Sequence, residues 1–77
     1  MNFSEKLKKF RLQNAYTQAE IAKLVGTDRA SISRYENGLA IPDMYKAVKL
    51  ARIMKTTCEE LVADNLTERN DNYGQST

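Results

Sequence analysis

Two short helical segments lie within residues 17–38 with a gap of about two residues, and this spacing constrains the fold more than any other feature. Thr17 followed by Glu20 three residues later forms a capping box, which predicts a helix start. Gly26 is typical of a helix end, and Asn37-Gly38 is a strong turn signal after the second segment. Two helices joined by so tight a turn must cross at a large angle, as in a helix-turn-helix.

The rest of the chain also has apolar residues at helical spacing and lacks the alternation of a strand, so we expect an all-α fold of five helices. The first helix is expected over residues 4–14 and the last over residues 58–62. The expected N-caps, in chain order, are Ser4, Thr17, Thr27 or Asp28, Asp43 and Thr57. The side chains expected to be buried in the central pair are Ile21, Ala22, Leu24, Val25, Ala30, Ile32 and Tyr35.

The length of 77 residues allows one small domain, which we expect over residues 1–66, followed by a polar and mobile tail over residues 67–77. Cys58 is the only cysteine, so no internal disulfide can form. No apolar run approaches the ~20 residues that span a bilayer, and no secretory signal is recognisable. These observations predict a cytoplasmic protein.

Catalytic and metal-binding chemistry find little support in the sequence. The chain has no histidine, so neither a His-based acid–base pair nor a His/Cys metal site can be built. No glycine-rich phosphate-binding loop is present. We therefore expect no enzyme activity, no metal, no cofactor and no small-molecule ligand.

Charge is distributed unevenly along the chain. Residues 1–55 carry eleven Lys and Arg against five acids, whereas residues 56–77 carry one Arg against five acids. A basic body with an acidic tail is common in proteins that contact a polyanion, although such charges can also merely solvate a small surface.

The sequence of the central pair carries a more specific signal. Its residues are the run Thr17 to Ala22, Val25-Gly26, Ser31-Ile32-Ser33 and the run Tyr35 to Gly38. This combination resembles the DNA-binding domain of the Cro and phage-repressor family, the XRE type, and the resemblance covers about residues 4–63. It implies a lambda-repressor-like five-helix domain with a central helix-turn-helix.

The resemblance also implies how the domain would meet DNA, with its third helix in the major groove of a double strand. Arg29 and Arg34 are the favoured base readers, because an arginine can donate two hydrogen bonds to guanine; as ordinary surface residues they would only be solvated. The residues expected to read bases are Gln18, Arg29, Ala30, Ser33 and Arg34. Those expected to contact phosphates are Thr17, Thr27, Ser31, Asn37 and Gly38.

Three features of the sequence bear on how closely the chain follows the family. The loop Leu39–Ile41 has no basic residue where the family commonly has one, which puts a phosphate contact there in doubt, apart from backbone donors. Lys46 and Lys49 could compensate only if their faces of the fourth helix turn toward the DNA. Lys55 stands where a helix-ending glycine is usual, so the exit from the fourth helix should be less favourable. Arg11 and Glu36 occupy positions that are sometimes joined by an ion pair, and we expect that pair here.

The resemblance implies a transcriptional regulator, most simply a repressor that acts as a homodimer on a palindromic operator. The alternative is a protein-interaction adaptor or antitoxin-type module that keeps the fold, because fold alone does not fix function. The last helix supplies the candidate dimer surface, although its apolar stripe can equally close the core of the monomer. The candidate residues are Cys58, Leu61, Val62 and Leu66.

Overall fold

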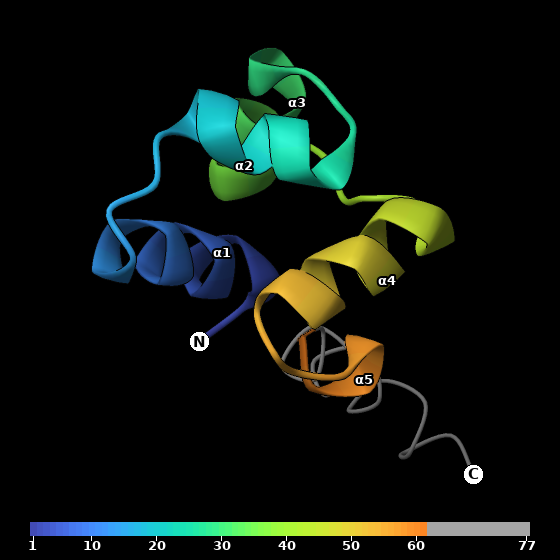
Figure 1. Ribbon diagram of the computed structural model, residues 1–77. Coiled ribbons are helices and arrows are strands. Elements are labelled where there is room, and N and C mark those ends of the chain that lie inside the picture. The colour runs from blue at the N-terminus through green and yellow to red at the C-terminus, as the bar shows by residue number, and fades with distance from the viewer. Residues whose placement is uncertain (62–77) are drawn as a thin grey trace, which may run out of the picture.

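The computed structural model describes residues 1–61, in which all regular elements are α-helices (Figure 1). The predicted all-α architecture of five helices is confirmed. Residues 62–77, which include Val62, Leu66 and the predicted tail over 67–77, lie outside the described residues. The helices are α1 (Phe3–Gln13), α2 (Gln18–Val25), α3 (Arg29–Glu36), α4 (Met44–Ile53) and α5 (Cys58–Leu61).

The start of α1 differs from the prediction, because its N-cap is Asn2 and not Ser4. The Asn2 side chain accepts a hydrogen bond from the Glu5 N–H at 3.0 Å, and the Glu5 carboxylate accepts one from the Asn2 N–H at 3.2 Å. Glutamate three residues after the cap completes a capping box, whereas the third residue after Ser4 is the apolar Leu7. The reciprocal bond therefore selects the earlier start.

The other helix starts follow the sequence. Thr17 caps α2 through the predicted capping box with Glu20. Of the two candidates for α3, Asp28 is the cap, since its carboxylate accepts the Ser31 N–H at 2.8 Å. The predicted caps Asp43 and Thr57 accept backbone N–H groups at the starts of α4 and α5.

The four longer helices end in one hydrogen-bond pattern, in which an N–H beyond the helix donates to the carbonyl five residues back. These bonds are Tyr16 to Arg11, Thr27 to Ala22, Leu39 to Arg34 and Thr56 to Ala51, at 2.8–2.9 Å. Each ending needs one residue with left-handed backbone. These residues are Ala15 (φ 57°), Gly26 (φ 83°), Gly38 (φ 72°) and Lys55 (φ 56°). Glycine adopts this conformation without strain, whereas alanine and lysine do not.

One apolar core joins all five helices. α3 packs on α1 and α2, and α4 packs on α2 and α5. Phe3 of α1 meets the ring of Tyr35 of α3 edge-on, with 6.1 Å between centroids. The buried side chains are Phe3, Leu7, Ile21, Ala22, Val25, Ile32, Tyr35, Leu50, Ala51 and Leu61.

Two of the expected core residues are instead exposed. Leu24 has 48% of its surface accessible, and Ala30 is also exposed. Each lies two positions from a buried residue, Ala22 and Ile32, and two positions correspond to about 200° around a helix. The expectation was wrong at these residues because the buried stripe of each helix is narrow.

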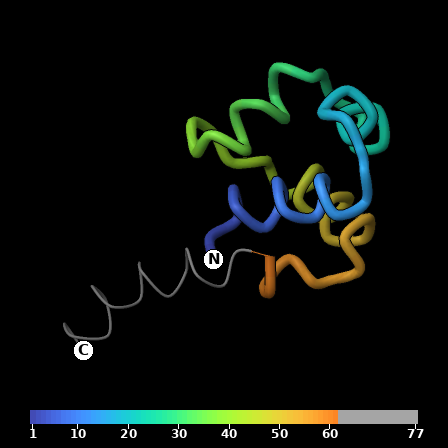
Figure 2. The backbone as a smooth tube through the Cα atoms, turned by 90° about the vertical axis from the view of Figure 1, so that its left-hand side faces the viewer, coloured from blue at the N-terminus to red at the C-terminus, as the bar shows by residue number. Residues whose placement is uncertain are grey.

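The arrangement leaves one side of α3 uncovered. α2 and α3 lie together at one end of the molecule, and α5 lies at the other, with α1 and α4 between them (Figures 1 and 2). The helices within residues 1–61 lack the length and the hydrophobicity that a membrane-spanning segment needs.

Candidate nucleic-acid interface

The turn between α2 and α3 is built by local hydrogen bonds. Gly26 has the left-handed backbone, and the Thr27 N–H returns to the carbonyl of Ala22 at 2.8 Å. Asp28 then starts α3 at once, so only two residues separate the Gly26 ending from the new helix. The small Ala22, 2% exposed, lets α3 approach α2 closely.

α3 has two different faces. Ile32 and Tyr35 are buried in the core, at 0% and 5% exposure. Arg29, Ala30 and Arg34 face outward and are exposed. Within residues 1–61, neither arginine forms an ion pair or a side-chain hydrogen bond. The guanidinium donors are therefore available to another molecule.

Gln18 belongs to a partly buried polar network that joins three helices. Arg11 of α1 forms a two-pronged ion pair with Glu36 of α3, with Nε–Oε2 at 2.7 Å and Nη2–Oε1 at 3.1 Å. Arg11 also donates to the Tyr16 carbonyl at 3.2 Å, and Gln18 Nε2 donates to Glu36 Oε1 at 3.2 Å. The predicted Arg11–Glu36 pair is confirmed. Because Nε2 is held by Glu36, the network orients the amide of Gln18.

The ion pair between Arg11 and Glu36 is shielded from solvent, and it changes the pKa of Arg11. The side chains of Arg11 and Glu36 are only 14% and 3% exposed. The hydrogen bond to Glu36 raises the pKa of Arg11 above its usual value, against the opposing effect of burial. The two side chains are thus paired beneath the surface of α3.

At the start of α3, Asp28 is negatively charged and has polar partners. Hydrogen bonds from the Ser31 side chain and backbone lower the pKa of Asp28. The ionised cap favours the helix N-terminus, but it also repels a phosphate from the neighbouring Thr27 and Ser31. Ser31 and Thr27 are both half-buried.

The start of α2 presents a different environment. Thr17 is exposed, and its hydroxyl oxygen accepts the Glu20 N–H at 3.1 Å. A hydroxyl that accepts in a cap still has its own proton to donate. Thr17 is therefore placed to donate to a phosphate beside the oriented Gln18.

The end of α3 has few free donors. The Asn37 N–H donates to the Ser33 carbonyl at 3.0 Å, and the Gly38 N–H donates to the Tyr35 carbonyl at 3.2 Å. The Asn37 amide donates to the Ser33 carbonyl at 2.8 Å and to its hydroxyl at 3.4 Å. The backbone donors expected to serve a phosphate at Asn37 and Gly38 are therefore already used within the helix cap.

The candidate dimer residues differ in where the structure places them. Leu61 is 1% exposed and belongs to the core of the monomer, the second of the two uses that the sequence left open. Cys58 is half-buried and packs against that core. Val62 and Leu66 lie outside the described residues. The sequence reasoning missed four strongly exposed apolar side chains, Leu39 and Ile41 in the loop after α3 and Met44 and Tyr45 in the first turn of α4, at 71–83% exposure.

Comparison with known proteins agrees with this geometry. A family model described as helix-turn-helix matches residues 7–61, which is most of the chain and includes α2, the turn and α3. The chain belongs to the helix-turn-helix family. The XRE-type resemblance noted from the sequence is thereby confirmed.

Among curated proteins, the chain is similar to the SPbeta prophage-derived uncharacterized HTH-type transcriptional regulator YonR of Bacillus subtilis. The two are 35% identical over 60 residues, which cover 78% of this chain and 56% of YonR. The cryptic phage CTXphi transcriptional repressor RstR of Vibrio cholerae is 31% identical over 70 residues, covering 91% of this chain and 62% of RstR. The chain thus spans less than two thirds of either relative.

The fold of this family is also seen in a solved structure. The P22 c2 repressor in complex with a synthetic operator superposes with a TM-score of 0.76 at 21% identity, covering 80% of this chain and 94% of the other. This likeness shows that the fold is that of a phage-repressor domain.

Proposed function

We propose that this protein binds double-stranded DNA sequence-specifically and regulates transcription as a repressor, with α3 in the major groove. The observation that carries the proposal is the outward face of α3, where Arg29, Ala30 and Arg34 are exposed while Ile32 and Tyr35 anchor the helix in the core. A helix of eight residues held in this way can enter the groove without losing its packing.

The exposed groups suit the edges of base pairs. Arg29 and Arg34 can each donate two hydrogen bonds to a guanine, and Ala30 can touch a thymine methyl. Gln18 contributes its amide oxygen, whose orientation is set by the hydrogen bond from Nε2 to Glu36. Ser33, half-buried beside them, contributes its hydroxyl.

Phosphate contacts would hold the protein in register on the duplex. Thr17 is the strongest of the predicted contacts, because its hydroxyl proton is free at the N-terminus of α2. Thr27 and Ser31 contribute where the strand passes far enough from the carboxylate of Asp28.

A homodimer follows from the size of the reading surface. One short helix contacts only a few base pairs, so useful specificity needs two copies on a palindromic operator. The half-sites should then lie one helical turn apart, about 34–36 Å, or a multiple of that distance. The similarity to a phage repressor named as such in Vibrio cholerae supports repression as the outcome.

A protein-interaction module is the second candidate. It is favoured by the exposed apolar side chains of Leu39, Ile41, Met44 and Tyr45, which are close in sequence, because exposed apolar surface can mark a protein contact. An adaptor would use this surface and would not need Arg29 and Arg34.

A binding selection tests the proposal. Fragments of the source genome are incubated with the protein at about 150 mM salt, where the Debye length is ~8 Å, and the bound pool is sequenced. We expect an inverted repeat whose spacing reports the dimer geometry. A pool without any motif would reject sequence-specific binding and favour the interaction module.

A further inference from the structure

The exit of α3, at Asn37 and Gly38, is a predicted phosphate contact but has few free hydrogen-bond donors. The N–H groups of Asn37 and Gly38 are both used in the helix cap. The loop that follows, Leu39–Ile41, has no basic side chain. A cation for a phosphate at this exit must therefore come from another element.

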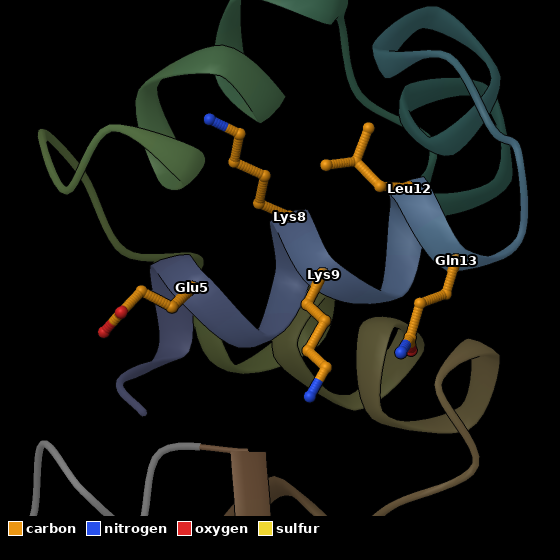
Figure 3. Close-up of a pocket in the computed structure, with 5 residues that line it drawn as sticks. All are labelled: Glu5, Lys8, Lys9, Leu12 and Gln13. Atoms are coloured by element: carbon orange, nitrogen blue, oxygen red, sulfur yellow. The ribbon is translucent and has the colours of Figure 1, made fainter.

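Helix α1 lies against this exit. A Cβ atom placed on Gly38 would stand 3.7 Å from the hydroxyl oxygen of Ser4. Lys8 is one turn further along α1, and its side chain extends from the helix toward the C-terminal half of α3 (Figure 3). Lys8 is exposed and lines a shallow hollow of about 320 Å³ on α1.

The charge of Lys8 is not neutralised by the acids nearest to it. Glu5, one turn earlier, is held in the capping box with Asn2 and points away from Lys8 in Figure 3. Glu36, at the end of α3, is paired with Arg11. Within the described part of the chain, Lys8 has no ion pair and no side-chain hydrogen bond.

We propose that Lys8 is a phosphate-binding residue of the DNA interface, and that α1 thereby supplies the cation that the loop after α3 lacks. This inference rests on the proposed function. A lysine ammonium on a flexible stem can follow a phosphate without a fixed geometry. Such a contact strengthens binding to every sequence and leaves base preference unchanged.

The chain offers a matched control in the next residue. Lys9 has the same charge, lies on the same helix and is also exposed. Lys9 borders the same hollow, but its side chain leaves α1 in a different direction, away from α3 and toward α4 (Figure 3). Replacing either lysine by glutamine removes one charge, so any difference between the two variants reports position and not net charge.

The experiment measures the dissociation constant of wild type, Lys8→Gln and Lys9→Gln between about 50 and 200 mM KCl, by fluorescence anisotropy. Two duplexes are used, one containing the selected site and one of random sequence. For Lys8→Gln we expect the slope of log affinity against log salt to become shallower by about 0.9 per bound protomer. The loss should be equal on both duplexes, and Lys9→Gln should keep the wild-type slope.

A conservative variant and a thermal unfolding measurement test whether the effect comes from lost charge or from lost stability. Lys8→Arg keeps the charge and should retain the wild-type slope, and the thermal midpoints of all variants should agree because both lysines are exposed. Equal slopes for Lys8→Gln and Lys9→Gln, with specific binding intact, would overturn this inference and leave the proposed function standing. A wild-type protein that binds neither duplex would overturn both.

Discussion

Within residues 1–61, the charged side chains on the inner side of α3 are paired, whereas those on its outer side are not. On the inner side, Glu36 is almost fully buried and is bound by Arg11 and Gln18. On the outer side, Arg29 and Arg34 are exposed and unpaired within the described residues. The charges of Arg11 and Glu36 join α1 to α3. The charges of Arg29 and Arg34 contribute little to folding and are available to contact DNA. Mutations on the inner and outer sides of this one short helix should therefore change stability and DNA recognition separately.

The largest expected effect is on the inner side. Arg11→Ala leaves the buried carboxylate of Glu36 without its cation, and removing one partner of a buried pair costs about 3 kcal/mol. A domain of this size has little more than roughly 5 kcal/mol of stability. We expect the urea midpoint, followed by circular dichroism, to fall steeply.

The double variant Arg11→Met/Glu36→Leu is the control for this first prediction. It removes both charges, so it should lose much less stability than Arg11→Ala. An Arg11→Ala protein as stable as a typical surface variant would contradict the assignment of the pair to the inner, structural side.

The outer side should give a large effect on binding and none on folding. Arg29→Ala and Arg34→Ala each remove a pair of potential hydrogen bonds to guanine, worth about 2 kcal/mol of discrimination. The ratio of affinities for the selected site and a random duplex should fall about 30-fold for each, while the melting temperature stays unchanged. A fall in stability with specificity preserved would reverse the assignment of the two sides.

The third prediction concerns substitutions at two helix ends, away from both sides of α3, that should change stability. Ala15 and Lys55 end α1 and α4 with left-handed backbone, as Gly26 and Gly38 end α2 and α3. Ala15→Gly and Lys55→Gly should each stabilise the protein by about 0.5–1 kcal/mol, because the strain of the side chain is removed. Urea denaturation measures the gain, and the DNA affinity should not change.

Gly26→Ala is the opposite control for these helix endings. Its new Cβ would stand 3.5 Å from the Lys49 Nζ, an ordinary contact, so backbone strain dominates. We expect a loss of about 1 kcal/mol. If the glycine and alanine substitutions shifted stability in the same direction, the strain argument would fail.

The smallest effect concerns pH at the start of α3. The pKa of Asp28 is lowered in the folded protein by hydrogen bonds from Ser31. The stabilisation is therefore complete above the ordinary aspartate pKa and is lost as the pH falls through the lowered value. The stability of wild type relative to Asp28→Asn, which keeps a neutral cap, should decline as the pH falls from about 5 toward 2. A difference that does not depend on pH would show that the charge of the cap is unimportant.

The sequence predicted the central pair well because its signals are local. The capping box at Thr17, the glycine at position 26 and the turn at Asn37-Gly38 each depend on residues a few positions apart, and the structure has α2 and α3 between them. The Arg11–Glu36 pair, although distant in sequence, was predictable only through the family resemblance. Its further bond to Gln18 carries no sequence signal.

The features that the sequence did not predict depend on competition between possible N-caps or on the direction in which a side chain points. Ser4 and Asn2 are both suitable caps, and the reciprocal bond of Glu5 decides between them. Leu24 is apolar at near-helical spacing, yet it falls outside the narrow buried stripe of α2. Lys8 and Lys9 look alike in the sequence, and only the directions in which their side chains leave α1 distinguish them (Figure 3).

The central claim is that the outer face of α3 reads DNA sequence, and a paired binding selection tests it most directly. Wild type and the double variant Arg29→Ala/Arg34→Ala are given the same pool of genomic fragments at the same salt concentration. We predict an inverted repeat from wild type and a pool without that motif from the double variant, which remains folded. Recovery of the same motif with both proteins would contradict the claim.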